Sequence, residues 1–224
     1  MEKRHRIFVA INLPEEIKKE LFSYSEKWAE LPAKWTDKNN LHITLEFLGA
    51  LTDEEIGEVC VIVKEVAERH SCFSLSINQV LYGPPKKMPP RPPKFLDGKK
   101  DNKSDGQEDA FEDNDFKSEE KFWRPRMVWA EGEKSKELAA IREDLENSLT
   151  EKVRFVPENR TFAPHITLAR ISSWEWKQIE PEERPEVNEN IDLPFTVESI
   201  EVMESVLKRG GPVYTILESH QLKS

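Results

Sequence analysis

The sequence predicts an α+β fold made of two similar halves that are related by a pseudo-twofold axis. Two observations carry this prediction: the tetrapeptide His-Ile-Thr-Leu occurs at 42–45 and again at 165–168, and both copies end the same order of elements. A β-forming segment, an amphipathic helix and the His-Ile-Thr-Leu strand occur once from Ile7 to Leu48 and again from Met127 to Ala169. We therefore expect one bilobal domain over residues 1–224.

The first half opens with Ile7–Leu13, a run rich in β-forming residues that ends at a proline typical of helix starts. Leu41–Leu48 alternates polar and apolar side chains, as a strand with one apolar face does. Thr52 and Glu55 have the spacing of a capping box that opens a second helix, and Phe73–Leu81 is predicted to be a strand. The helix between the first two strands is indicated by apolar residues at steps of four and three: Ile17, Leu21, Tyr24, Trp28 and Leu31.

Residues 84–122 break this pattern. The segment is rich in proline up to Pro93, its basic residues concentrate in 86–103, and its acidic residues concentrate in 105–120. Such a composition buries too little apolar surface to offset the entropy lost on ordering. We interpret the segment as a flexible insertion, and a basic arm that folds over the substrate is the alternative.

The second half is expected to begin with a strand at Arg126–Gly132. A helix follows, and its apolar stripe is formed by Leu138, Ile141, Leu145 and Leu149. The strand with the second tetrapeptide comes next, and then a polar stretch at Glu175–Asn190. Two final strands are predicted at Phe195–Val206 and Val213–Leu217, joined by a Gly210-Gly211 turn.

The charge of the chain limits the class of ligand. The formal net charge is −10 and the sequence pI is about 5.2. Proteins that bind long nucleic acids through phosphates usually present a basic face. We therefore expect a small phosphate-bearing substrate or the end of an RNA, and no binding of an extended duplex.

The apolar segments and the cysteines indicate where the protein acts. No apolar run is long enough to span a membrane, and the short N-terminal one is interpreted as a strand and not as a signal peptide. Cys60 and Cys72 fit buried thiols in a reducing compartment better than a disulfide framework. These features predict a cytoplasmic protein with no membrane partner.

Each tetrapeptide presents two functional side chains on one face of its strand. Residues two apart point to the same side, so His42 lies beside Thr44 and His165 beside Thr167. One such pair is usually no more than polar surface, whereas two pairs in equivalent places of a repeat indicate a shared site. Hydroxyls can donate hydrogen bonds to phosphate oxygens, and imidazoles can take and give protons near neutral pH. The pattern therefore predicts hydrolysis of a phosphodiester, with the two histidines as acid and base.

A metal site is the alternative use of two histidines. Such a site normally adds Asp, Glu or Cys ligands at recognisable spacing, and neither tetrapeptide carries one. Glu46 is expected on the face of His42, but at the far end of the strand, and Ala169 stands at the matching position of the second copy. We therefore expect no metal and no other cofactor.

Longer blocks around these residues resemble the two-histidine phosphoesterase superfamily, and within it the RNA 2′,3′-cyclic phosphodiesterases, also called 2′-5′ RNA ligases. The resemblance covers most of the chain and lies in residues 6–14, 34–49, 124–129 and 162–170. It implies two antiparallel sheets that line a central cleft, with helices outside. It also implies opening of an RNA 2′,3′-cyclic phosphate to a 2′-phosphate, with His165 as the base toward water and His42 as the acid toward the leaving 3′ oxygen.

The resemblance also implies substrate contacts outside the histidines. Thr44 and Thr167 would bind the phosphate, the family's arginine after the second motif falls on Arg170, and an aromatic residue of the first strand falls on Phe8. On a regular strand Arg170 points away from His165, so it reaches the phosphate only where the strand bends or ends. A surface salt bridge for Arg170 and core packing for Phe8 are the alternatives.

Three functions stay open on the sequence alone. The first is a metal-independent phosphodiesterase that acts on RNA ends. The second changes only the substrate, to 2′-5′ linked oligonucleotides or cyclic nucleotides, or runs the reaction as a ligase. The third is a non-catalytic module that binds RNA ends, which the two intact His-x-Thr pairs disfavour because binding alone requires no proton transfer. In each case we expect a monomer.

Overall fold

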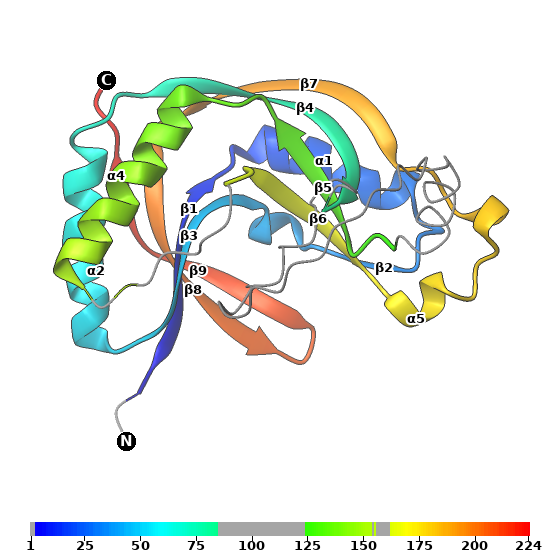
Figure 1. Cartoon of the computed structure of the whole chain (residues 1–224), viewed down its shortest axis with the longest axis horizontal. Coiled ribbons are helices and arrows are strands. Elements are labelled where there is room, and N and C mark those ends of the chain that lie inside the picture. Colours follow the sequence, from blue (N-terminus) through cyan, green and yellow to red (C-terminus); the bar gives the residue numbers. More distant parts are fainter. Residues whose placement is uncertain (1–2, 85–123, 154, 156–161) are drawn as a thin grey trace, which may run out of the picture.

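The computed structural model describes residues 3–84, 124–153, 155 and 162–224. From residue 85 on, the insertion expected at 84–122 lies outside these ranges. Two antiparallel sheets form the frame of the molecule (Figure 1). The first sheet has the strand order β3 (His42–Leu51), β1 (His5–Asn12), β8 (Ser199–Lys208) and β9 (Gly211–Gln221). The second has the order β2 (Ala33–Trp35), β6 (His165–Ile171), β5 (Met127–Gly132), β4 (Phe73–Gly83) and β7 (Asn188–Val197).

The longer helices of the described residues pack against the sheets. α2 (Asp53–Ala67) and α4 (Lys136–Lys152) contact each other beside the first sheet, at the left of Figure 1. α1 (Glu15–Lys27) contacts β6 of the second sheet. The shorter elements are α5 (Ser173–Trp176), η1 (Lys38–Asn40) and η2 (Pro181–Glu183). One continuous hydrophobic core joins both sheets to these helices, with Val9, Leu45 and Leu145 among its enclosed side chains. In the described part of the chain, every helix is too short or too polar to cross a membrane.

The predicted repeat is confirmed. β1 pairs antiparallel with β3, β5 pairs antiparallel with β6, and a helix lies between the two strands of each pair along the chain. The helices cross over: α1 of the first repeat contacts β6, and α4 of the second contacts β3. An ion pair of 3.2 Å between Arg142 of α4 and Glu46 of β3 strengthens the second crossing. Each helix therefore supports the histidine strand of the other repeat.

Local signals in the sequence explain several boundaries. Thr52 accepts a hydrogen bond from the Glu55 amide and the Glu55 carboxylate accepts one from the Thr52 amide, so the predicted capping box starts α2. The strand predicted at Phe195–Val206 is wrong, because the chain leaves β7 of the second sheet at Val197 and enters β8 of the first at Ser199. The apolar alternation continues through this crossing, so periodicity alone cannot mark it. β2 was not predicted, because three residues are too few to show a period.

Candidate active site

The two His-x-Thr pairs lie on neighbouring strands. His42 and Thr44 belong to β3, His165 and Thr167 belong to β6, and these strands of opposite sheets contact each other (Figure 1). All four side chains are partly exposed, whereas the residues between them, Ile43 and Ile166, are buried. The predicted alternation thus turns both pairs out of the core. We call these four residues the His-Thr site.

His42 is held by a carbonyl on one side and a hydroxyl on the other. Its Nδ1 lies 2.7 Å from the Asn40 carbonyl oxygen, which can only accept, so Nδ1 carries the hydrogen. Its Nε2 is then an acceptor, and the Thr44 hydroxyl donates to it over 3.0 Å. The rings of Phe8 and Tyr214 pack against the imidazole at centroid distances of 5.0 and 5.1 Å. These contacts fix both the tautomer and the orientation of His42.

His165 has the same tautomer but different neighbours. Its Nδ1 donates to the Ala163 carbonyl over 2.8 Å, so its Nε2 is also an acceptor. The imidazole stacks on the indole of Trp129 with centroids 3.8 Å apart and planes at 22°. In the part of the chain that the structure describes, Thr167 makes no hydrogen bond to His165. In both imidazoles of the site the ring hydrogen is on Nδ1, so each Nε2 can accept a proton.

The pKa values of both histidines are lowered. Burial lowers the pKa of His42 to about 4, the hydrogen bond to Asn40 opposes this shift, and positive charge on His165 and on Lys18 adds to it. Burial also lowers the pKa of His165, against its hydrogen bond to Ala163. Both rings are therefore neutral at neutral pH in the free protein. A bound phosphate anion would favour the protonated form of either ring.

A β-bulge at the last residue of each tetrapeptide decides which later side chains join the site. In β3 the register jumps from Ala10–Thr44 to Val9–Glu46, and in β6 it jumps from Trp129–Thr167 to Val128–Ala169. Leu45 and Leu168 are the extra residues. A bulge places two successive side chains on one face and so reverses the alternation that follows.

The first bulge corrects the expectation for Glu46. Its carboxylate does not share the face of His42 but is buried, 3% exposed, against Arg142. Phe47 takes the place on the site face and is 61% exposed. Its ring lies 6.0 Å from that of Phe8, its cross-strand partner. We call His42 and Thr44 the first half-site and His165 and Thr167 the second. The first half-site thus ends in an exposed aromatic ring.

The second bulge removes the difficulty with Arg170. Leu168 and Ala169 are both buried, so Arg170 emerges on the face of His165 and Thr167. Its guanidinium is exposed and lies 3.8 Å from the sulfur of Met127, its cross-strand partner. The salt bridge considered as the alternative is not among the ion pairs of the described residues. That Arg170 binds the phosphate stays a prediction.

Phe8 is buried directly behind the His42 imidazole. Its ring is 2% exposed and packs between His42, Phe47 and Tyr214. This arrangement supports His42 directly. Stacking of Phe8 on a nucleobase stays a prediction.

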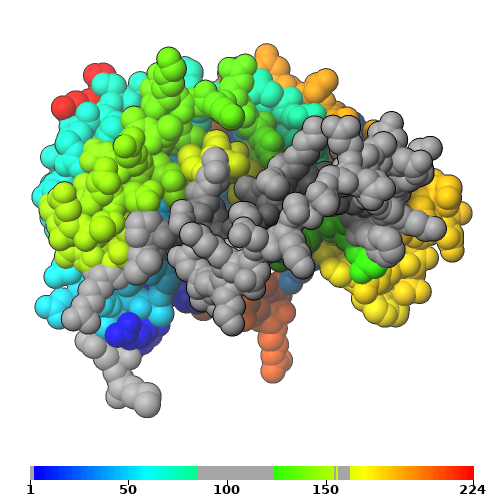
Figure 2. Space-filling view, viewed as in Figure 1, coloured from blue at the N-terminus to red at the C-terminus, as the bar shows by residue number. Residues whose placement is uncertain are grey.

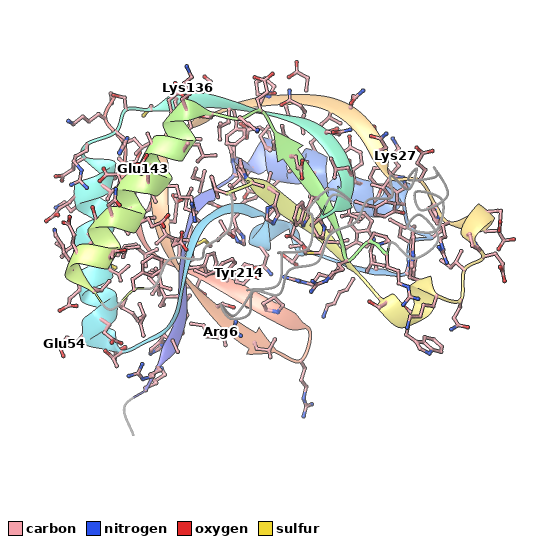
Figure 3. The ribbon with its side chains drawn as sticks, in the orientation of Figure 1. Arg6, Lys27, Glu54, Lys136, Glu143 and Tyr214 are labelled. Carbon is pink, nitrogen blue, oxygen red and sulfur yellow. The ribbon has the colours of Figure 1, made fainter. Side chains whose placement is uncertain are left out.

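The sequence did not single out three residues that shape the site. The buried Asn40 side chain donates to the Pro212 carbonyl over 2.8 Å and accepts from the Tyr214 amide over 3.1 Å, so it ties β9 to the start of β3. Tyr214 consequently stands beside His42, near the centre of Figure 3. Trp129 of β5 is buried, and its indole is the surface on which His165 stacks. The repeat makes β5 the counterpart of β1, and this correspondence is the only signal in the sequence that could have indicated a role for Trp129 beside His165.

The site offers no cluster of metal ligands. Among the described residues, no group of three or more His, Cys, Asp or Glu side chains could hold a metal ion. The polar groups of the site are instead two neutral imidazoles and two hydroxyls. Such groups can bind an anion and move protons.

Comparisons with known proteins give a consistent picture. A family model described as LigT like Phosphoesterase matches residues 11–93 and 128–214. The chain is 25% identical over 223 residues to an RNA 2′,3′-cyclic phosphodiesterase of Thermotoga maritima, across 97% of this chain and 96% of the relative. A relative of the same name from Aeropyrum pernix is 28% identical over 188 residues, across 84% and 85% of the two chains.

Solved structures show the same fold. A protein of Thermus thermophilus, TT0787, superposes with a TM-score of 0.68 at 25% identity, covering 97% of this chain and 98% of that one. LigT of E. coli, solved in complex with 3′-AMP, gives a TM-score of 0.68 at 21% identity, covering 99% and 100%. These neighbours confirm two antiparallel sheets as the frame of the molecule.

Proposed function

The chain belongs to the LigT-like phosphoesterase family, and on that premise we propose that it hydrolyses 2′,3′-cyclic phosphate ends of RNA to 2′-phosphates without a metal ion. The relatives from Thermotoga maritima and Aeropyrum pernix are named for this activity on RNA. The observation that carries the proposal is the matched state of the two imidazoles. In both, Nδ1 donates to a backbone carbonyl, which leaves Nε2 to exchange a proton in the site.

The site can carry out the reaction with two proton transfers, one at the attacking water and one at the leaving oxygen on the other side of the phosphorus. Nε2 of His165 takes a proton from a water molecule as the water oxygen bonds to phosphorus. Nε2 of a protonated His42 gives its proton to the 3′ oxygen as the bond from phosphorus to that oxygen breaks. The product keeps its phosphate on the 2′ oxygen, and solvent returns a proton from His165 to His42.

The direction of transfer follows the family resemblance and requires His42 to gain a proton when substrate binds. The negative phosphodiester raises the pKa of a nearby imidazole, which offsets the burial that lowers the pKa of His42 to about 4 in the free protein. The Thr44 hydroxyl must then turn, because it donates to Nε2 in the free state. Once turned, the hydroxyls of Thr44 and Thr167 are free to donate to non-bridging phosphate oxygens.

The site is complete within one chain, because β3 and β6 supply all four of its residues. We therefore propose that a monomer is the active form. Arg170, one residue past the second bulge, supplies the positive charge that a phosphodiester anion requires.

The test uses EDTA-treated protein and a dinucleotide that ends in a 2′,3′-cyclic phosphate. We expect undiminished turnover and a 2′-phosphate product, and a loss of about 10²–10⁴-fold in His42→Ala and in His165→Ala. His70→Ala is the matched control, because this imidazole pairs with Asp144 of α4 and takes no part in the His-Thr site. Retained activity in either site variant contradicts the acid–base pair, and activity that EDTA abolishes and zinc restores contradicts metal independence.

A further inference from the structure

Four cations extend from the strand of the second His-x-Thr pair to the end of the β8–β9 hairpin. Arg170 of β6 and Lys34 of β2 are cross-strand partners in the second sheet. Lys208 and Arg209 lie at the end of the β8–β9 hairpin in the first sheet. All four side chains are exposed. We call Lys34, Arg170, Lys208 and Arg209 the basic strip.

Lys34 makes the basic strip continuous across the two sheets. A Cβ atom built on Gly211 would lie 3.1 Å from the Lys34 Nζ, so this amine rests against the backbone of the β8–β9 turn. Gly211 is the cross-strand partner of Lys208, and its φ of +128° suits glycine. The strip therefore runs from Arg170, on the face of His165 and Thr167, to the end of the hairpin. Figure 2 shows this hairpin, in orange, projecting from the lower edge of the molecule.

The charges of the strip are not compensated by nearby carboxylates of the described chain. Among the ion pairs of the described residues, none includes a member of the strip. Several other cations of the described chain do form ion pairs: Lys38 with Glu15, Arg69 with Asp144 and Lys152 with Glu65. This local excess of positive charge occurs in a chain whose net charge is −10.

We propose that the basic strip binds the sugar–phosphate backbone of the RNA strand that leads to the reacting 3′ end. The inference rests on the proposed function, since it takes the cyclic phosphate to lie between His42 and His165. From there the preceding phosphates pass Arg170 and Lys34 and reach Lys208 and Arg209. Flexible Lys and Arg side chains that contact phosphates position a strand without reading its bases. The strip thus selects RNA ends over free cyclic nucleotides and leaves the sequence of the RNA unread.

The experiment compares a 2′,3′-cyclic mononucleotide with a hexanucleotide that ends in the same cyclic nucleotide. We expect a higher kcat/KM for the hexanucleotide and a steeper fall of that value with salt concentration, because phosphate contacts release counterions. In Lys34→Ala and in Lys208→Ala/Arg209→Ala, the ratio of the two kcat/KM values falls by about threefold to tenfold per removed charge. The salt dependence of the hexanucleotide reaction flattens in parallel.

Lys64→Ala is the matched control, because Lys64 is an exposed lysine on α2, away from the strip. It removes one positive charge and should leave the length preference intact, while Lys34→Arg should retain most of it. A wild-type protein that turns over both substrates equally, or strip variants that keep the full preference, would overturn the proposal and leave the proposed function standing. A protein that turns over neither substrate would instead overturn the proposed function.

Discussion

The two half-sites share a backbone plan and differ in what surrounds it. In β3 and in β6 a histidine, a threonine and a bulge follow one another at the same spacing. His42 has an aromatic wall of Phe8 and Tyr214 and a hydroxyl on its Nε2. His165 has a single stacked indole, from Trp129. The shared plan fixes two equivalent imidazoles, and the surroundings make them chemically unequal.

The greatest difference lies one residue past each bulge. That position holds Phe47 in the first half-site and Arg170 in the second. Their cross-strand neighbours, Phe8 and Met127, occupy equivalent positions on β1 and β5, but one side chain is aromatic and the other is a thioether. A pseudo-symmetric frame can therefore offer an aromatic surface on one side of the phosphate and a positive charge on the other. An RNA end, which has a base on one side and a charged backbone on the other, has the same asymmetry.

The largest expected effect separates the roles of the two histidines. A nucleoside 4-nitrophenyl phosphodiester has a leaving group that needs no proton, so loss of the acid matters little for it. His42→Ala should therefore lose about 10²–10⁴-fold in kcat on the cyclic phosphate and far less on the nitrophenyl ester. His165→Ala should lose activity on both, and steady-state kinetics measure the four values. The opposite pattern would reverse the assignment of acid and base.

The next largest effect is expected from removing the positive charge of Arg170, which follows the second bulge. Arg170→Ala should lower kcat/KM for the cyclic mononucleotide by about 10–150-fold, since a hydrogen bond to a charged group contributes about 1.5–3 kcal/mol. Arg170→Lys should recover part of this loss, because it restores the charge without the planar fork. If Arg170→Ala retains wild-type kinetics, the guanidinium does not reach the phosphate.

The ring past the first bulge gives a smaller effect. Phe47→Ala should raise KM about tenfold for a cyclic nucleotide, because the exposed ring can stack on a base, and such stacking is worth about 1–3 kcal/mol. A ribose cyclic phosphate without a base is the control substrate, and its KM should not change. An equal rise for both substrates would show that Phe47 acts by supporting Phe8 and not by stacking.

The smallest effect concerns the free protein. Imidazole signals followed by NMR against pH should show His42 titrating below His165. Burial lowers the pKa of His42 to about 4, and the positive charges of Lys18 and of a His165 that is already protonated oppose its protonation further. Lys18→Met removes one of these charges and should raise the pKa of His42, while that of His165 stays nearly unchanged. Coincident titration curves would mean that the two surroundings are electrostatically equivalent.

Much of the frame could be predicted from the sequence, because period-two and helical alternation report which face of an element is buried. The two His-x-Thr pairs followed from the same alternation. It failed at Glu46 and Arg170, since a bulge adds one residue without changing composition, and the register that reveals it exists only between paired strands. Asn40 and Tyr214 were missed for a related reason: their contact joins positions far apart along the chain.

The exchange of helices and strands between the two repeats determines how fragments of the chain can fold. β8 and β9 complete the first sheet from the C-terminal part of the chain, and β2 joins the second sheet from the N-terminal part. A chain cut between β4 and β5 would therefore yield two fragments that each lack strands of their own sheet. Neither fragment should fold alone, but the mixed pair should reassemble, so this connection is a natural place for a split reporter of fragment association.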